Sequence, residues 1–190
     1  RPSRIAVQTS RHRRILAALL LSPNTVVPLS KLVEVLWEEY PPATATKQVQ
    51  NCVSALRERL DSAGNGLIAT DGAGYRITVA EDQLDLLRFQ RAVASARGLA
   101  STGQLAESVT ELRSALRLWR GPALDGLGAA ALSSRVARVD EQRITAIEQC
   151  VEWQLALGGH HEVVEELAEW VGDYPLREGP QRQLMLALYR

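Results

Sequence analysis

Residues 46–60 carry apolar side chains along one side of a predicted helix, and no other pattern constrains the fold of this chain as strongly. The apolar positions follow the helical spacing i, i+3, i+4, i+7 and i+11: Val49, Cys52, Val53, Leu56 and Leu60. Thr44 or Thr46 is a suitable N-cap, and Gly64-Asn65-Gly66 is a suitable terminator. A helix with one apolar stripe buries that stripe against other elements, so we expect its opposite, polar side to remain open.

Two more helices and a β-hairpin are predicted within the first 80 residues. The helices are expected over about 10–21 and 30–40, and the hairpin strands over 67–70 and 75–79. Pro23 and Pro41-Pro42 end the two helices, because proline cannot continue the hydrogen-bond ladder. Residues 4–7 are expected to form a short extended segment. Three helices followed by a hairpin is the order of a winged helix-turn-helix domain, which we place at residues 1–80.

The charges of the chain are divided unevenly between its halves. The 190 residues include 22 Lys+Arg and 22 Asp+Glu, so the formal net charge is zero. Residues 1–80 hold ten basic and six acidic side chains, a net charge of +4, and residues 81–190 have a net charge of −4. This asymmetry is expected when one half meets a polyanion, although ordinary sampling also produces splits of this size.

The polar side of helix 46–60 carries side chains that can read DNA bases. Gln50 and Asn51 can bond bidentately to adenine, Arg57 can bond to guanine, and Ser54 can bond to several bases. We therefore predict these four as base-reading residues. The predicted contacts to the DNA backbone are Arg13, Arg14, Thr44, Thr46, Lys47, Thr70 and Arg76. The alternative is a merely solvated face, because polar residues lie opposite the apolar stripe on nearly every surface helix.

Residues 81–190 are predicted to be helical throughout. Helices are expected from Asp85, over about 104–119, 132–157 and 161–171, and from about 177 onward. Helices separated by a Gly turn and then by Tyr174-Pro175 have the rhythm of a helical-hairpin repeat. The predicted fold is therefore mainly α with a small β component: a winged helix-turn-helix domain followed by an all-α, TPR-like helical-repeat domain. The repeat is interrupted at Arg190, so we expect the domain to continue beyond it or to pack on its neighbours.

The remaining motifs indicate no second function. Residues 126–131 fit a dinucleotide fingerprint by letter, but no strand precedes them. The His160-His161 pair is a poor metal site, because adjacent histidines point to different faces of a helix. Without a catalytic constellation, we expect no enzyme activity, no cofactor and no bound metal. Structural roles are expected for Cys52, Cys150, Trp119, Trp153 and Trp170. We also expect no membrane contact and a cytoplasmic location.

Several motifs, taken in order, resemble the Streptomyces antibiotic regulatory protein (SARP) family. In the first half they are Arg4-Ile5-Ala6-Val7, residues 13–21, Leu36-Trp37-Glu38, residues 41–45, Val53-Ser54-Ala55-Leu56-Arg57 and Gly74-Tyr75-Arg76-Ile77. In the second half they are residues 85–89, residues 118–124, Tyr174-Pro175-Leu176-Arg177-Glu178 and residues 183–190. The resemblance covers nearly the whole chain.

The resemblance implies an OmpR-type winged-helix domain, here without its leading strands, and a bacterial transcriptional activator domain truncated at its C-terminus. It implies an activator that binds direct repeats in double-stranded promoter DNA, usually of antibiotic or other secondary-metabolite genes, and recruits RNA polymerase. In the family the winged helix contacts the sigma subunit, and the helical domain supports a homodimer on DNA at the nucleoid. The alternative function is a TPR-like protein-interaction scaffold without direct base readout.

Overall fold

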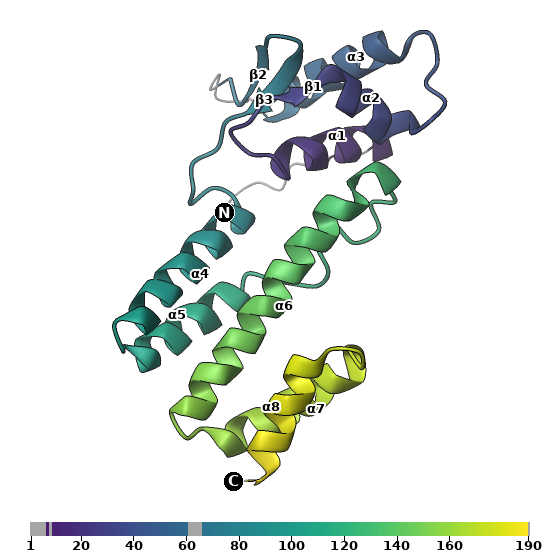
Figure 1. The fold of residues 1–190 in the computed structure, drawn as a ribbon. Helices are drawn as coiled ribbons and strands as arrows, with labels where there is room; N and C mark the ends of the chain where they lie inside the picture. The colour runs from purple at the N-terminus through teal and green to yellow at the C-terminus, as the bar shows by residue number, and fades with distance from the viewer. Residues whose placement is uncertain (1–6, 8, 61–65, 190) are drawn as a thin grey trace. The chain divides into compact units, whose positions relative to one another are not determined.

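The computed structural model describes residues 7, 9–60 and 66–189, which form two compact units (Figure 1). The first unit comprises the described residues up to Ala80 together with Gly121–Val139, and the second comprises Glu81–Arg120 and the described residues from Asp140 onward. The prediction placed all of residues 81–190 in the second domain. In the packing of the structure, residues 121–139 belong to the first unit. Most of the predicted segment 4–7, and most of the predicted terminator 64–66, lie outside the described residues.

The first unit is a winged helix, as predicted. Its elements are α1 (Ser10–Leu20), β1 (Val27–Pro28), α2 (Leu29–Trp37), α3 (Ala45–Leu60), β2 (Ile68–Asp71), β3 (Gly74–Ile77), the short 3-10 helix η1 (Ala130–Leu132) and the start of α6 (Ser133–Ala156). The strands form an antiparallel sheet in the order β1-β3-β2. Figure 1 shows the β2–β3 hairpin and the α2–α3 loop on opposite sides of this unit.

Two local features differ from the prediction. Strand β1 was not expected, because two residues show no alternation, and this strand exists only through its pairing with β3. Helix α2 ends at Trp37 rather than at the prolines. The next residue, Glu38, takes a left-handed φ of 55° while its N–H still bonds to the Glu34 carbonyl at 2.8 Å, so the chain turns one step after the helix ends.

The hairpin is held in place at its turn and at its base. Gly74 faces β1 so closely that a Cβ there would collide with the Val27 carbonyl oxygen. Gly72 takes the left-handed φ of 54° that the two-residue turn requires. At the base, the Asn24 side chain donates to the Val79 carbonyl at 3.0 Å and accepts from the Val79 N–H at 2.9 Å. The hairpin is therefore anchored to the turn that follows α1.

The predicted apolar side of α3 is the side that is buried. Val49, Val53 and Leu56 are 0–1% exposed. They lie in one core with side chains from α1, α2 and the sheet, among them Ile15, Leu19, Leu32, Ile68 and Ile77. Because this stripe fixes the rotation of α3 about its axis, it also fixes which side chains of α3 face solvent.

The segment 121–139 forms part of the same core. Leu132, in η1, is fully buried in it, and η1 contacts α2. Arg14 Nη2 donates to the Gly128 carbonyl at 2.6 Å, and Arg135 Nη1 donates to Ser22 Oγ at 2.7 Å. Gly126 and Gly128 have left-handed φ values of 71° and 60°, which explains the glycines in a stretch that matched the dinucleotide fingerprint by letter.

The second unit is all-helical, as predicted. It contains α4 (Asp85–Ser101), α5 (Leu105–Leu116), residues 140–156 of α6, α7 (His160–Asp173) and α8 (Glu178–Tyr189). One apolar cluster centres on Phe89, Leu112 and Cys150, and a second on Val151, Val163 and Leu167. Trp119 and Trp153 pack on the first cluster and Trp170 on the second, which confirms the structural roles predicted for them.

Two arginines tie the helices of the second unit together. Arg113 of α5 bonds to Glu166 of α7 at 2.7 and 3.1 Å and to Gln154 of α6 at 2.7 Å. Arg177, in the turn before α8, bonds to both carboxylate oxygens of Glu148 and of Glu141, at 2.8–3.2 Å. These hydrogen bonds raise the pKa of the Arg177 guanidinium, so it stays charged.

Both cysteines lie where structural roles place them. Cys52 is half-buried and packs against the core of the first unit, and Cys150 is buried in the second unit. Burial raises the pKa of the Cys150 thiol to about 11, so it is a neutral thiol near pH 7.

Candidate nucleic-acid interface

The outward side of α3 presents polar side chains to solvent. Gln50, Asn51 and Ser54 are exposed on one side of the helix. Val49 and Val53 lie on the opposite side and are buried in the core. Three of the four predicted base readers therefore share one open side of a helix. The amides offer both donors and acceptors, and the hydroxyl offers either, which is the chemistry that major-groove base edges require.

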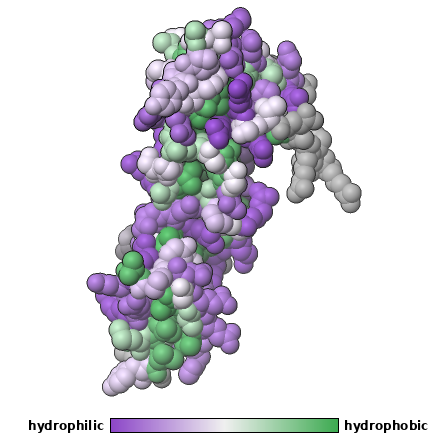
Figure 2. All heavy atoms as spheres, turned by 90° about the vertical axis from the view of Figure 1, so that its right-hand side faces the viewer, coloured by the Kyte–Doolittle hydropathy of each residue, from purple (hydrophilic) through white to green (hydrophobic). Residues whose placement is uncertain are grey.

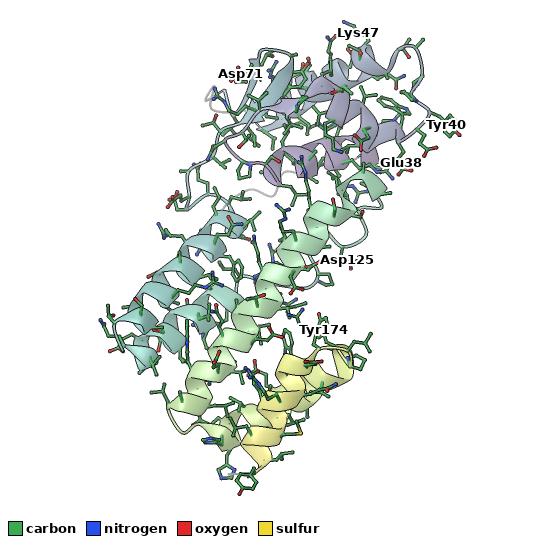
Figure 3. The ribbon with its side chains drawn as sticks, viewed as in Figure 1. Glu38, Tyr40, Lys47, Asp71, Asp125 and Tyr174 are labelled. Carbon is green, nitrogen blue, oxygen red and sulfur yellow. The ribbon has the colours of Figure 1, made fainter. Side chains whose placement is uncertain are left out.

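The N-terminal end of α3 adds positive charge to this side. Thr44, Thr46 and Lys47 are exposed there, and Lys47 points away from the body of the unit (Figure 3). Lys47 makes no hydrogen bond or ion pair with the described residues, so its ammonium is open to a ligand. The first turn of α3 holds no acidic residue, so nothing offsets the positive end of the helix dipole.

Sequence reasoning missed Arg11, which lies beside the same end of α3. Its Nη1 donates to Gln48 Oε1 at 2.8 Å, and its guanidinium carbon lies 5.5 Å from the centre of the Trp37 ring. Gln48 in turn donates to Thr44 Oγ1 at 2.9 Å. The available signal was spacing: Arg11 precedes the buried Ile15 by four residues and so shares its helix face. Burial raises the pKa of the nearby Cys52 thiol, and the charge of Arg11 opposes that rise.

Arg57 does not share the open side of α3. It is half-buried, its Nε donates to the Ile68 carbonyl at 2.7 Å, and its Nη2 donates to Thr70 Oγ1 at 2.9 Å. Its guanidinium carbon lies 5.7 Å from the centre of the Tyr75 ring. The structure thus places the fourth predicted base reader against the hairpin.

The predicted backbone contacts of the hairpin also have partners within the chain. Thr70 is exposed, but its hydroxyl oxygen accepts the bond from Arg57. Arg76 Nη2 pairs with Asp71 Oδ2 at 3.3 Å across the hairpin, and both side chains are 42% exposed. An exposed pair of this kind is weak, so Arg76 can exchange Asp71 for a phosphate at little cost.

The two arginines predicted in α1 lie in different surroundings. Arg13 is exposed and has no hydrogen bond or ion pair with the described residues. Arg14 is half-buried and holds the Gly128 carbonyl of segment 121–139. The geometry therefore separates Arg13, which is free to meet a ligand, from Arg14, which is engaged inside the unit.

A winged helix whose α3 has an open polar side, followed by an all-helical unit, is the architecture expected of a bacterial transcriptional regulator. The family model described as "Transcriptional regulatory protein, C terminal" matches residues 5–77, and the model described as "Bacterial transcriptional activator domain" matches residues 84–190. No helix among the described residues is both long enough and apolar enough to cross a membrane.

Named relatives agree with these matches. The chain is 35% identical to the regulatory protein AfsR of Streptomyces coelicolor over 187 residues, which is 98% of this chain and 18% of AfsR. It is 31% identical to the regulatory protein DnrI of Streptomyces peucetius over 187 residues, which is 94% of this chain and 69% of DnrI. A solved structure of Mycobacterium tuberculosis EmbR with a low-affinity phosphopeptide matches with a TM-score of 0.92 and 31% identity, covering 97% of this chain and 50% of that chain.

The chain belongs to the SARP family of transcriptional regulators. It spans less than a fifth of AfsR and half of the EmbR chain.

Proposed function

We propose that this protein is a sequence-specific DNA-binding activator whose helix α3 enters the major groove. The observation that carries the proposal is the exposure of Gln50, Asn51 and Ser54 on one side of α3, next to the unpaired cation of Lys47. The first three residues read base edges, and Lys47, Thr46 and Arg13 contact phosphates. Arg57 and Arg14 are not assigned to DNA, because Nε and Nη2 of Arg57 and Nη2 of Arg14 already bond within the unit.

Selection from a pool of randomised duplexes tests this proposal. The full chain should enrich a defined sequence and bind it more tightly than a scrambled duplex of the same composition. Affinity should fall linearly on a log–log plot against salt, with a slope near −0.9 for each phosphate neutralised. Gln50→Ala should raise the Kd for the selected duplex and leave the Kd for the scrambled duplex nearly unchanged. Failure to enrich any sequence contradicts the proposal.

We propose further that the sites are direct repeats upstream of promoters, among them promoters of antibiotic or other secondary-metabolite genes. This part rests on the family of the chain, and footprinting on the regions upstream of neighbouring biosynthetic genes tests it. Two protected half-sites in the same orientation are expected. Protection of a single half-site, or of two inverted ones, contradicts it.

Contact with RNA polymerase is proposed for the α2–α3 loop. Tyr40 in this loop is 85% exposed and stands clear of the unit (Figure 3), and the exposed Glu38 and Glu39 directly precede it. An exposed aromatic beside acidic residues suits a protein partner and would repel phosphate. Tyr40→Ala should therefore leave DNA affinity unchanged and lower transcription in a reconstituted reaction with RNA polymerase. Loss of both activities assigns Tyr40 to DNA binding or folding instead.

The second unit is proposed to support a homodimer on the repeats. Helix α8 exposes four large apolar or aromatic side chains: Met185, Leu186, Leu188 and Tyr189. Figure 2 shows hydrophobic surface near the lower end of the molecule in that view. Exposed apolar surface of this kind favours protein contact. Light scattering should show two copies on a two-repeat duplex, and Leu188→Glu should reduce the complex to one copy at equal protein concentration. A second copy bound equally well by the variant contradicts this assignment.

A further inference from the structure

Arg57 leaves α3 toward the hairpin and contacts both of its strands. On β2 it donates to the main-chain oxygen of Ile68 and to the hydroxyl of Thr70, at 2.7 and 2.9 Å. On β3 its guanidinium lies over the ring of Tyr75, which pairs directly with Thr70 across the hairpin. A single side chain of the proposed recognition helix therefore binds three neighbouring points of the wing.

This contact adds polar bonds between the hairpin and α3 to the apolar anchors that the hairpin has in the core, where Ile68 and Ile77 are each 3% exposed. Strand β1 contributes only two residues of pairing, Val27 with Tyr75 and Pro28 with Gly74. The Asn24 bonds lie at the base of the hairpin, at Val79. A two-stranded hairpin is marginally stable by itself, whereas charge-assisted hydrogen bonds from a half-buried guanidinium are strong and directional. The Arg57 bonds thus join the edge strand β2 to α3 at two polar points, in addition to the burial of Ile68 in the shared core.

We infer that Arg57 is a positioning residue that sets the place of the wing beside the recognition helix and so controls DNA affinity without reading sequence. The inference rests on the proposed function. Three roles for Arg57 give different results. If Arg57 reads a base, its substitution weakens binding to the preferred sequence only. If Arg57 contacts a phosphate, its substitution weakens binding to every sequence equally and lowers the salt slope by about one. If Arg57 positions the wing, its substitution weakens binding to every sequence equally, and the effect on Kd is not additive with that of a substitution at Thr70, its partner on the wing.

The test is a double-mutant cycle on the full chain, using a duplex selected from a randomised pool by the wild-type chain and a scrambled duplex of the same composition. Arg57→Ala should raise the Kd for both duplexes by the same factor, about tenfold. Thr70→Val, which removes the hydroxyl and keeps the shape, should raise both Kd values by a smaller factor. In the double variant, Thr70→Val should not raise the Kd values beyond those of Arg57→Ala, because Arg57→Ala has already removed the bond between the two side chains. Arg57→Lys, which can keep the bond to the Ile68 carbonyl, should recover part of the affinity.

Each other result overturns the inference. These results are a loss confined to the selected duplex, additivity with Thr70→Val together with a salt slope reduced by about one, or a lower free energy of unfolding with unchanged Kd for the folded protein. Gln50→Ala is the matched control on α3, because it should raise the Kd for the selected duplex and leave the Kd for the scrambled duplex nearly unchanged. If Gln50→Ala does so while Arg57 and Thr70 are additive, the proposed function stands and the positioning role fails. If the wild-type chain selects no duplex, both fail.

Discussion

At the scale of single residues, what matters is whether a polar side chain is free or already bonded within the protein. Arg13 and Arg14 are adjacent in sequence and identical in chemistry, yet one is exposed and the other holds the Gly128 carbonyl at 2.6 Å. Gln50 and Arg57 differ in the same way on α3. Residue type alone therefore does not separate free donors from engaged ones, because a donor inside a half-buried hydrogen bond must first lose that bond to reach a ligand.

Arg13 and Arg14 form a matched pair for separating binding from stability. Arg14→Ala should lower the free energy of unfolding by about 1–2 kcal/mol, because it removes a charge-assisted bond to a carbonyl. Arg13→Ala should leave stability within about 0.5 kcal/mol of the wild type and lower the salt slope of DNA binding by about one. Chemical denaturation and salt-dependent titration measure the two effects. A reversed pattern contradicts the assignment of both residues.

The two cysteines should differ in reactivity. Burial raises the pKa of Cys150 to about 11 from 9.0, so at pH 8 almost none of the thiol is ionised and its sulfur is shielded. An acid whose pKa is higher in the folded state destabilises the fold only as the pH rises above its unfolded pKa, so Cys150 adds no pH dependence to stability below about pH 9. Iodoacetamide at pH 8, read by mass spectrometry, should label half-buried Cys52 first. Equal labelling of both cysteines in the folded protein contradicts this.

At the scale of elements, long-range packing gives meaning to segments that have no pattern of their own. Residues 121–131 look like a linker in sequence, yet Leu127, Ala129 and Ala131 pack on the core that buries Leu132. Strand β1 likewise depends on β3, which lies far along the chain. The turn before α8 is held by Arg177, so the Tyr-Pro-Leu-Arg motif has a physical role in bonding that turn to α6.

Leu132 should be a major contributor to the stability of the first unit. Leu132→Ala creates a cavity in a fully buried site and should cost about 2–5 kcal/mol of unfolding free energy. Leu124→Ala, in the same segment but 39% exposed, is the control and should cost much less. Urea denaturation followed by tryptophan fluorescence distinguishes them. Equal costs would mean that segment 121–139 is not held by Leu132.

Arg177 should stabilise the second unit through its two carboxylate partners. Arg177→Ala leaves Glu141 and Glu148 without their shared cation and should lower the free energy of unfolding by about 1–2 kcal/mol. The exposed Arg182, in α8, provides the control substitution to alanine, with an expected effect within about 0.5 kcal/mol. Thermal denaturation monitored by circular dichroism is the measurement. An Arg182 effect as large as that of Arg177 would falsify the role given to these ion pairs.

At the scale of the whole molecule, the compact units do not follow the order of the chain. The first unit is built from two separate stretches, and the second continues on either side of Gly121–Val139. The winged-helix core therefore includes Leu132, which lies beyond the boundary predicted at residue 80.

A fragment of residues 1–80 should consequently be less stable than the winged helix of the full chain. It lacks Leu132 and the Gly128 carbonyl, so it exposes apolar core and leaves Arg14 without its acceptor. Its free energy of unfolding should fall below that of the first unit in the full chain by at least the loss caused by Leu132→Ala. Hydrogen exchange of the α1 amides in both proteins compares them directly. Equal protection in the fragment rules out a structural contribution from residues 121–139.

The sequence by itself determined the helices and the hairpin of the winged helix, the helical character of the second unit, and the open side of α3. Apolar spacing and turn residues are local signals, and burial of one stripe dictates what the opposite side presents. Only the tertiary structure decided the end of α2, the existence of β1, the place of residues 121–139, and the engagement of Arg14 and Arg57. These depend on which distant carbonyls and hydroxyls come within hydrogen-bond distance, and periodicity along a chain does not encode such distances.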